Sequence, residues 1–141
     1  MSHVFLHCSL DTTHTMKYVY WGTTALLALL MAASGTMYFV SDGAAQTFAR
    51  LGFPDYFRVE LGIAKLLGAG ALVVPLPRSV KEWTYAGFTI SFVSAVIAHV
   101  AAGDPISAIG PPVGAFGLLV GSYISYHQYA RAPGSASATA E

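Results

Sequence analysis

The chain has 141 residues, of which 55% are hydrophobic and only 10% are charged, and its formal net charge is zero. Soluble domains carry about 25% charged residues, so this composition favours a protein surrounded by the lipid bilayer. The lack of a basic excess argues against a nucleic-acid partner. A single cysteine, Cys8, excludes an internal disulfide or a thiol pair.

Residues 1–15 precede the first apolar run. They contain four side chains of metal-ligating types: His3, His7, Cys8 and His14. His3 and His7 would share a helix face, and Cys8 is a soft ligand, but the segment has no frame and no further partners for a metal. We therefore predict no metal site, and we interpret residues 1–15 as a disordered extension or an upstream mis-start.

Four apolar stretches follow, at residues 18–40, 61–76, 83–102 and 106–126. A helix needs about 20 residues to cross the hydrocarbon core. The first stretch is longer than the core of a signal peptide, so we expect it to be retained. The second reaches a full span only if Arg58 and Glu60 lie near its end. The sequence therefore predicts an all-α fold, with a four-transmembrane-helix bundle over residues 16–131 and a disordered tail at 132–141.

The connector at residues 42–56 is long for a loop in a helix bundle. Phe48 and Leu51 would share one face of a helix that Gly52 and Pro54 would end. We predict a short interfacial amphipathic helix between the first and second spans, lying on the membrane surface. A plain surface loop is the alternative.

Basic residues suggest an orientation. The side of the N-terminus would hold Lys17, Arg78, Lys81 and Arg131, whereas the opposite side would hold Arg50 and Arg58. Because positive charge is enriched in cytoplasmic loops, both termini are predicted to be cytoplasmic.

Small residues recur at spacings of three and four on three of the spans. They are Ala25, Ala28, Ala32 and Gly35; Gly87, Ser91, Ala95 and Ala98; and Gly110, Gly114, Gly117 and Gly121. Such stripes let helix backbones approach closely in lipid, so we predict close packing within the molecule. A stripe facing outward would instead mediate homo-oligomerisation, and the sequence does not choose between the two.

Five side chains that can form polar contacts are predicted at one level, near the end of the bundle opposite the termini. They are Tyr38, Glu60, Lys65, His99 and Asp104. Glu60 and Lys65 lie about 140° apart around the helix axis, whereas helical partners are three or four residues apart, so they do not pair with each other. Each needs a partner elsewhere.

Two interpretations of these charges stay open. In the simpler one, Glu60 marks the membrane boundary and Lys65 extends its ammonium to the surface. In the other, ionisable groups within a span mark a functional site, which would bind the polar head of a lipophilic molecule such as a quinone or would pass protons. Haem ligation by two histidines is disfavoured, because His99 and His127 are predicted at opposite ends of the bundle.

Several segments also carry a resemblance: "LGFPDYF" at 51–57, "ELGIAKLLGAGALVVP" at 60–75, "VKEWTYAGF" at 80–88, "AHVAAGDP" at 98–105, "GPP" at 110–112 and "SYISYH" at 122–127. In this order and spacing they resemble the short four-helix branch of the DoxX-like family over roughly residues 16–131. The resemblance implies an integral protein of the bacterial cytoplasmic (inner) membrane. Some relatives are linked to quinone-coupled sulfur oxidation and others to oxidative-stress complexes. Glu60, Lys65, His99 and Asp104 stand at motif positions of the family.

We therefore expect a redox accessory protein that binds a quinone or a similar lipophilic molecule and has no intrinsic cofactor. Its electron donor would be a membrane or peripheral partner protein. A non-enzymatic membrane scaffold or assembly factor is the alternative. A small solute or proton carrier is less favoured, because the sequence lacks broken helices and internal repeats. The sequence does not decide whether the protein is an enzyme.

Overall fold

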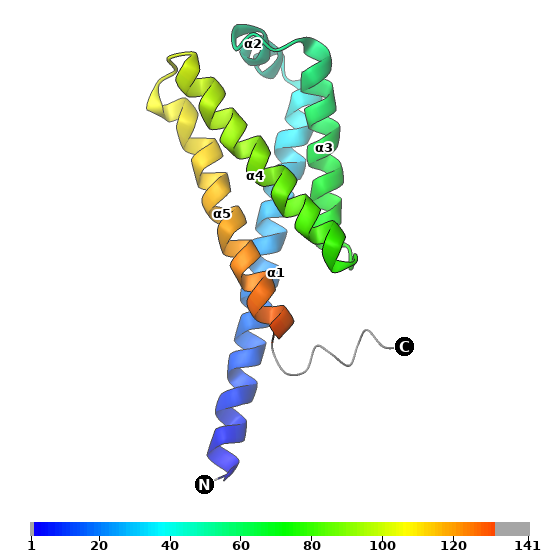
Figure 1. Ribbon diagram of the computed structural model, residues 1–141, viewed down its shortest axis with the longest axis vertical. Helices are drawn as coiled ribbons and strands as arrows, with labels where there is room; N and C mark the ends of the chain where they lie inside the picture. The colour runs from blue at the N-terminus through cyan, green and yellow to red at the C-terminus, as the bar shows by residue number, and fades with distance from the viewer. Residues whose placement is uncertain (1, 132–141) are drawn as a thin grey trace.

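The computed structural model describes residues 2–131, with side chains for residues 17–128, as five α-helices. They are α1 (Ser2–Val40), α2 (Asp42–Arg50), α3 (Asp55–Val73), α4 (Arg78–Ala101) and α5 (Ile106–Arg131) (Figure 1). This described part contains no β-strand, so the predicted all-α fold is confirmed. The predicted short helix between the first two long ones is present as α2.

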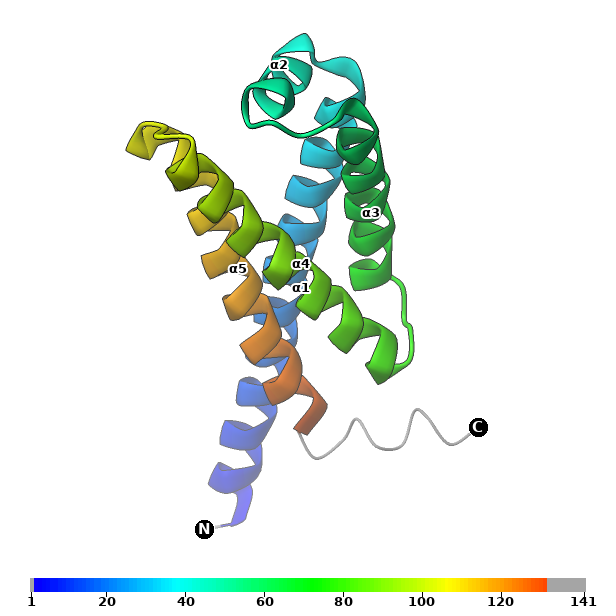
Figure 2. The ribbon, with the colours of Figure 1, turned by 45° about the horizontal axis from the view of Figure 1, so that its top comes forward.

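The long helices form two antiparallel pairs. α3 runs antiparallel to α1, and α4 and α5 form a hairpin that crosses this pair (Figures 1 and 2). The hairpin and the α1–α3 pair lie farther apart at the end of the molecule that holds α2. We call the end that holds α2 and the α4–α5 connection the α2 half. The end that holds Lys17, Gln128 and the α3–α4 connection is the terminal half.

Three helices are long and apolar enough to cross a membrane: Lys17–Val40, Arg78–Ala101 and Ile106–Gln128. The fourth predicted span is α3, which starts at Asp55 rather than at residue 61. Its 19 residues are long enough, but every 18-residue stretch of it includes Arg58, Glu60 and Lys65. The count of four spans therefore depends on how α3 accommodates these charges.

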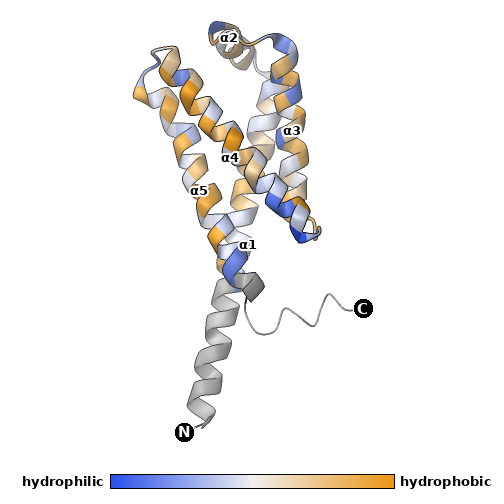
Figure 3. Cartoon of the chain, viewed as in Figure 1, coloured by the Kyte–Doolittle hydropathy of each residue, from blue (hydrophilic) through white to orange (hydrophobic). Residues whose placement is uncertain are grey.

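The outer surface of the helices is apolar. Figure 3 shows hydrophobic residues over all the long helices, and large side chains such as Leu67, Trp83, Ile90 and Ile106 are exposed. A protein in water rarely exposes so much continuous apolar surface. In lipid the same surface is compatible with its surroundings, which agrees with the three helices that are long and apolar enough to cross a membrane.

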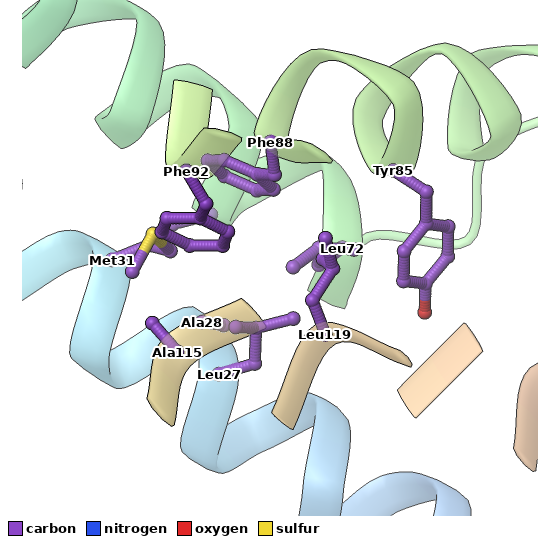
Figure 4. Packing of buried hydrophobic residues seen from close by; sticks show 10 residues of the cluster. Leu27, Ala28, Met31, Leu72, Tyr85, Phe88, Phe92, Ala115 and Leu119 are labelled. Atoms are coloured by element: carbon purple, nitrogen blue, oxygen red, sulfur yellow. The ribbon is translucent and has the colours of Figure 1, made fainter. Parts of the chain in front are cut away.

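The core lies where the two helix pairs cross. Leu27 and Met31 from α1, Leu72 from α3 and Leu119 from α5 are almost fully buried there. The Phe88 and Phe92 rings of α4 stack at 6.2 Å between centroids and cover the cluster (Figure 4). The packed cluster closes the middle of the molecule.

Close helix packing occurs at only part of the predicted stripes. A Cβ atom added at Gly35 would come within 3.1 Å of the Gly62 carbonyl oxygen, so α1 and α3 touch through glycines. The predicted packing of the fourth-helix stripe is wrong within this chain. Added Cβ atoms at Gly110, Gly114, Gly117 and Gly121 would meet nothing within 4 Å, because the hairpin diverges from α1 on one side and α5 is exposed on the other.

The two ends of the chain are described only in part. α1 begins at Ser2, so its backbone includes most of the segment that we interpreted as an extension. The side chains of residues 1–16 lie outside the described residues, as does the tail at 132–141. The interpretation of both ends stays a prediction.

Candidate functional site

A cavity of about 1010 Å³ occupies the space between the diverging helix pairs in the α2 half. Its walls are mostly apolar, which is typical of small-molecule sites. The α4 wall consists mainly of small residues: Gly87, Ser91, Ser94, Ala95 and Ala98. The second predicted small-residue stripe therefore lines a cavity instead of packing against a neighbouring helix.

Aromatic rings form the roof of the cavity beneath α2. Phe48, on the inner face of α2, lies 5.0 Å from the Tyr38 ring between centroids and 6.4 Å from the Phe57 ring. Phe53 stacks on Phe57 at 5.0 Å. The apolar face of α2, which the sequence assigned to the membrane surface, thus packs on the protein and on the cavity.

The C-terminal end of α2 explains how this roof is held. Gly52 adopts a positive φ of 82°, and the Gly52 and Phe53 amides donate to the carbonyls of Ala49 and Phe48. This is a Schellman motif, which favours glycine because a Cβ atom is strained at positive φ. Phe53 then packs on Phe48, 6.0 Å away between ring centroids, as the hydrophobic contact of the motif.

Lys65 provides the main cation of the cavity wall. Its ammonium donates to the Ser34 hydroxyl and to the Tyr38 hydroxyl, each at 2.8 Å, and lies 4.3 Å from the centroid of the Tyr38 ring. Only 7% of the residue is exposed. Among the described residues it has no carboxylate partner within ion-pair distance.

A second polar cluster closes the α2 half from the other side. Arg50, in the last turn of α2, donates to both carboxylate oxygens of Asp104, with 3.0 Å between Nη2 and Oδ2. His99 donates from Nδ1 to Oδ2 of the same carboxylate at 2.6 Å. We call these three residues the clasp, because they join α2 to the α4–α5 connection.

A tight turn places Asp104 over His99. Gly103 has a φ of 70°, and the Gly103 and Asp104 amides donate to the carbonyls of Val100 and His99. The turn is again a Schellman motif. It reverses the chain within one turn of the end of α4, so the Asp104 carboxylate faces the imidazole five residues earlier.

Charge partners set the ionisation of the clasp. Hydrogen bonds from Arg50 and then from His99 stabilise the carboxylate and lower the pKa of Asp104 from 3.8 to about 2. The hydrogen bond and charge of Asp104 likewise raise the pKa of Arg50. The Asp104 charge is therefore present at neutral pH and is compensated within the clasp.

The sequence model of the DoxX-like family matches residues 22–122, which is well over half of the chain. This chain belongs to the DoxX-like family. The resemblance inferred from the sequence is thereby confirmed, and the protein is a membrane protein with apolar helices. Comparison with curated proteins and with solved structures gave no match.

The fold of this DoxX-like protein brings together four of the five predicted site residues. Tyr38, Lys65 and His99 line the cavity. Asp104 does not line it but accepts a hydrogen bond from His99, which does. Glu60 is exposed and does not line the cavity, and no hydrogen bond or ion pair joins it to the other described residues. The turn of α3 between positions 60 and 65 directs the two side chains to different faces, as the spacing predicted.

Two residues of the site, Arg50 and Ser34, were not predicted from the sequence. Arg50 was placed at the correct end of the bundle but only as a loop charge. Its position in the last turn of an amphipathic helix, at the same level as Asp104, could have indicated that the two side chains pair. Ser34 offered none, because a serine in a span usually bonds to its own backbone.

The DoxX-like chain has a third polar cluster in the terminal half, away from the cavity. The Ser122 hydroxyl joins Thr24 at 2.9 Å and Tyr85 at 3.0 Å. Lys81 donates to the Leu72 carbonyl at 3.0 Å and to the Tyr20 hydroxyl at 3.3 Å. These groups are buried and bonded to one another, so we assign them a structural role.

No three His, Cys, Asp or Glu side chains within residues 17–128 are arranged to hold a metal ion. The four metal-ligating side chains noted at the N-terminus, His3, His7, Cys8 and His14, lie outside the described residues. His127 belongs to the terminal half, where Nε2 lies 3.2 Å from Glu82 Oε1, and is thus at the opposite end of the molecule from His99.

Proposed function

We propose that this DoxX-like protein crosses the membrane four times and binds a lipophilic small molecule of the quinone type in its cavity. It would serve as an accessory subunit of a redox partner protein. The observation that carries the proposal is an apolar cavity with polar donors, Lys65, Tyr38 and His99, gathered on its walls. Convergent polar groups in an otherwise apolar pocket are typical of binding sites.

The geometry suits a ring with carbonyl groups. The aromatic roof offers ring faces, and aromatic pairs contribute about 0.5–1.5 kcal/mol beyond the burial of their area. The Lys65 ammonium has three N–H donors and directs two to protein hydroxyls. A third remains for a carbonyl oxygen of the bound molecule.

α3 is proposed as the fourth span. At 1.5 Å per residue its 19 residues extend about 28 Å, close to the roughly 30 Å of the hydrocarbon core. Arg58 donates to the Tyr38 carbonyl and lies 2.7 Å from Asp55, so its charge is compensated at the helix start. Lys65 faces the cavity, and the exposed charges, Asp55 and Glu60, both lie near the start of the helix.

The location is proposed to be the bacterial cytoplasmic membrane with both termini in the cytoplasm. Lys17, Arg78 and Lys81 lie in the terminal half, and Arg50 and Arg58 lie in the α2 half. This distribution follows the positive-inside rule and would make the cavity open in the outer half of the bilayer. The electron donor is assigned to a partner protein, because a single cysteine provides no dithiol for redox chemistry.

The test is binding of a short-chain ubiquinone analogue to the purified protein in lipid nanodiscs, by isothermal titration or equilibrium dialysis. Lys65→Met should weaken binding about tenfold, since a charge-assisted hydrogen bond is lost. Glu60→Gln is the matched control and should leave the affinity unchanged. No binding by the parent protein, or equal affinities of the parent and Lys65→Met, would reject the quinone proposal.

One observation favours the scaffold alternative. The α5 glycines at positions 110 and 117 are exposed, have free space around them and do not line the cavity, so another membrane helix, from a partner or from a second copy, would fit against them. Replacing Gly110 and Gly117, which do not line the cavity, with leucine should abolish capture of a larger complex in mild detergent if this role holds. The quinone-analogue affinity should then be unchanged.

The carrier alternative is disfavoured by the packed core. Leu27, Leu72 and Leu119 pack between the cavity and the terminal half, and none of the three lines the cavity. A solute or proton path would need polar groups or water at this level. Proton flux through reconstituted vesicles that depends on His99 would contradict this argument.

A further inference from the structure

The two buried lysines of the described chain differ in what balances their charge. Lys81 donates to the Leu72 carbonyl in the last turns of α3, where the helix dipole is negative. Lys65 lies in the middle of α3 and donates only to neutral hydroxyls. Both are only 7% exposed, so each charge depends mainly on the groups that surround it.

The rest of the cavity wall does not supply the missing negative charge. No aspartate or glutamate lines the cavity, and its ionisable lining groups are Lys65, His99 and the Tyr38 hydroxyl. Asp104 lies behind His99, with its carboxylate shared between Arg50 and His99. The exposed Glu60 is outside the cavity. The wall therefore presents a net positive field, which a low-dielectric environment strengthens.

We infer that the cavity selects an amphiphile with an anionic head group, a carboxylate or a phosphate, and that Lys65 recognises this anion. The inference rests on the proposal that the cavity binds a lipophilic small molecule, and it names the charge of the head. The anionic head group would then accept the third hydrogen bond of Lys65 and balance the positive charge of its ammonium. Charge-assisted hydrogen bonds of this kind are about twice as strong as neutral ones.

The remaining walls suit the hydrocarbon part of such a molecule. Small residues from Gly87 to Ala98 leave room along α4, and Leu30 and Met31 of α1 form the facing apolar surface. Beyond them the core closes the cavity. The head would lie beside Lys65 below the aromatic roof, and the chain would extend along α4 toward the core.

The experiment compares a charged and an uncharged probe of equal length. Radiolabelled palmitate and methyl palmitate are titrated into phosphatidylcholine nanodiscs that contain the full chain, at alkaline pH where the fatty-acid carboxyl is ionised. We expect the parent protein to bind palmitate about tenfold more tightly than the ester. Lys65→Met should lose this preference, and Lys65→Arg should retain most of it.

Lys81→Met is the matched control, because it removes an equally buried lysine that does not line the cavity. It should keep the preference for palmitate even if its melting temperature falls. Competition by phosphatidylglycerol in a separate arm identifies the source of the anion. Displacement of palmitate that depends on Lys65 assigns the site to a phosphate-headed membrane lipid, and no displacement assigns it to a free carboxylate.

Equal affinity of the parent protein for palmitate and its ester would overturn the inference, as would an unchanged preference in Lys65→Met. The quinone analogue distinguishes this failure from failure of the proposed function. If the analogue binds and palmitate shows no preference, the cavity binds a neutral lipophile and only the inference fails. If palmitate binds through Lys65 and the analogue does not bind, the inference holds and the quinone assignment fails.

Discussion

The two halves of the molecule bury polar groups in different ways. In the terminal half, Thr24, Ser122 and Tyr85 bond to one another below a dense core. In the α2 half, the helix pairs diverge, and Lys65 and His99 face a cavity. A buried polar group that is bonded within the protein stabilises the fold, whereas one directed at open space remains available for a ligand. This difference is the reason why we place the proposed binding site in the α2 half.

The largest expected effect comes from removing a core side chain where the helix pairs cross. Leu119→Ala should lower the free energy of unfolding by about 2–5 kcal/mol, because a cavity forms among side chains that cannot fully relax. Leu30→Ala is the control, since Leu30 lines the existing cavity and is half exposed. Its effect should be within about 1 kcal/mol.

Reversible unfolding in mixed micelles measures both variants. Similar losses of stability would mean that the α2 half is packed as densely as the core, and the contrast between the halves would be lost.

A smaller effect is expected from the hydroxyl cluster. Ser122→Ala leaves the Thr24 and Tyr85 hydroxyls without their shared partner, which should cost about 1–3 kcal/mol. Ser91→Ala, on the cavity wall, removes a hydroxyl that bonds to no described group and should change stability by less than about 0.5 kcal/mol. The same micelle titration measures both. If Ser91→Ala were destabilising, the Ser91 hydroxyl would contribute to stability as the hydroxyls of the terminal half do, and the contrast between the halves would be lost.

The smallest expected effect is the pH dependence of the clasp. The pKa of Asp104 falls from 3.8 to about 2 on folding. Because the folded pKa is lower, the carboxylate stabilises the folded state fully above pH 3.8 and loses this contribution as the pH falls to about 2. The melting temperature of the parent protein should therefore approach that of Asp104→Asn over this interval.

Thermal melts in detergent at a series of pH values measure the difference between the two proteins. A difference that stays constant down to pH 2 would show that Asp104 acts through packing and not through its charge.

Much of the fold could be predicted from local patterns in the sequence. Apolar runs of about 20 residues predicted three of the long helices, and Gly52 with Pro54 predicted the end of α2. The end of α4 at Gly103 follows from similar turn chemistry. The start of α3 was predicted less accurately, because its first turns carry Asp55 and Arg58 and are not a continuous apolar run.

The site was predictable only as a set of residues at one level of the bundle. Helix direction and residue number placed Tyr38, Lys65, His99 and Asp104 near the same end. Whether they touch depends on the rotation of each helix and on the angle between the helix pairs. The pairing of Asp104 with Arg50, and of Lys65 with Ser34, joins residues 54 and 31 positions apart, and spacing alone does not specify such contacts.

The sequence by itself determined that this protein is an all-α membrane protein, because hydropathy and local turn chemistry act over short stretches of chain. The order and spacing of its motifs carried the resemblance to the DoxX-like family, which the family model confirmed. Only the tertiary structure decided which small residues pack and which line a cavity. It also decided that Lys65, and not Glu60, faces that cavity. The physical reason is that helix crossing is set by the sum of many contacts between distant residues, of which the glycine contact between Gly35 and Gly62 is one.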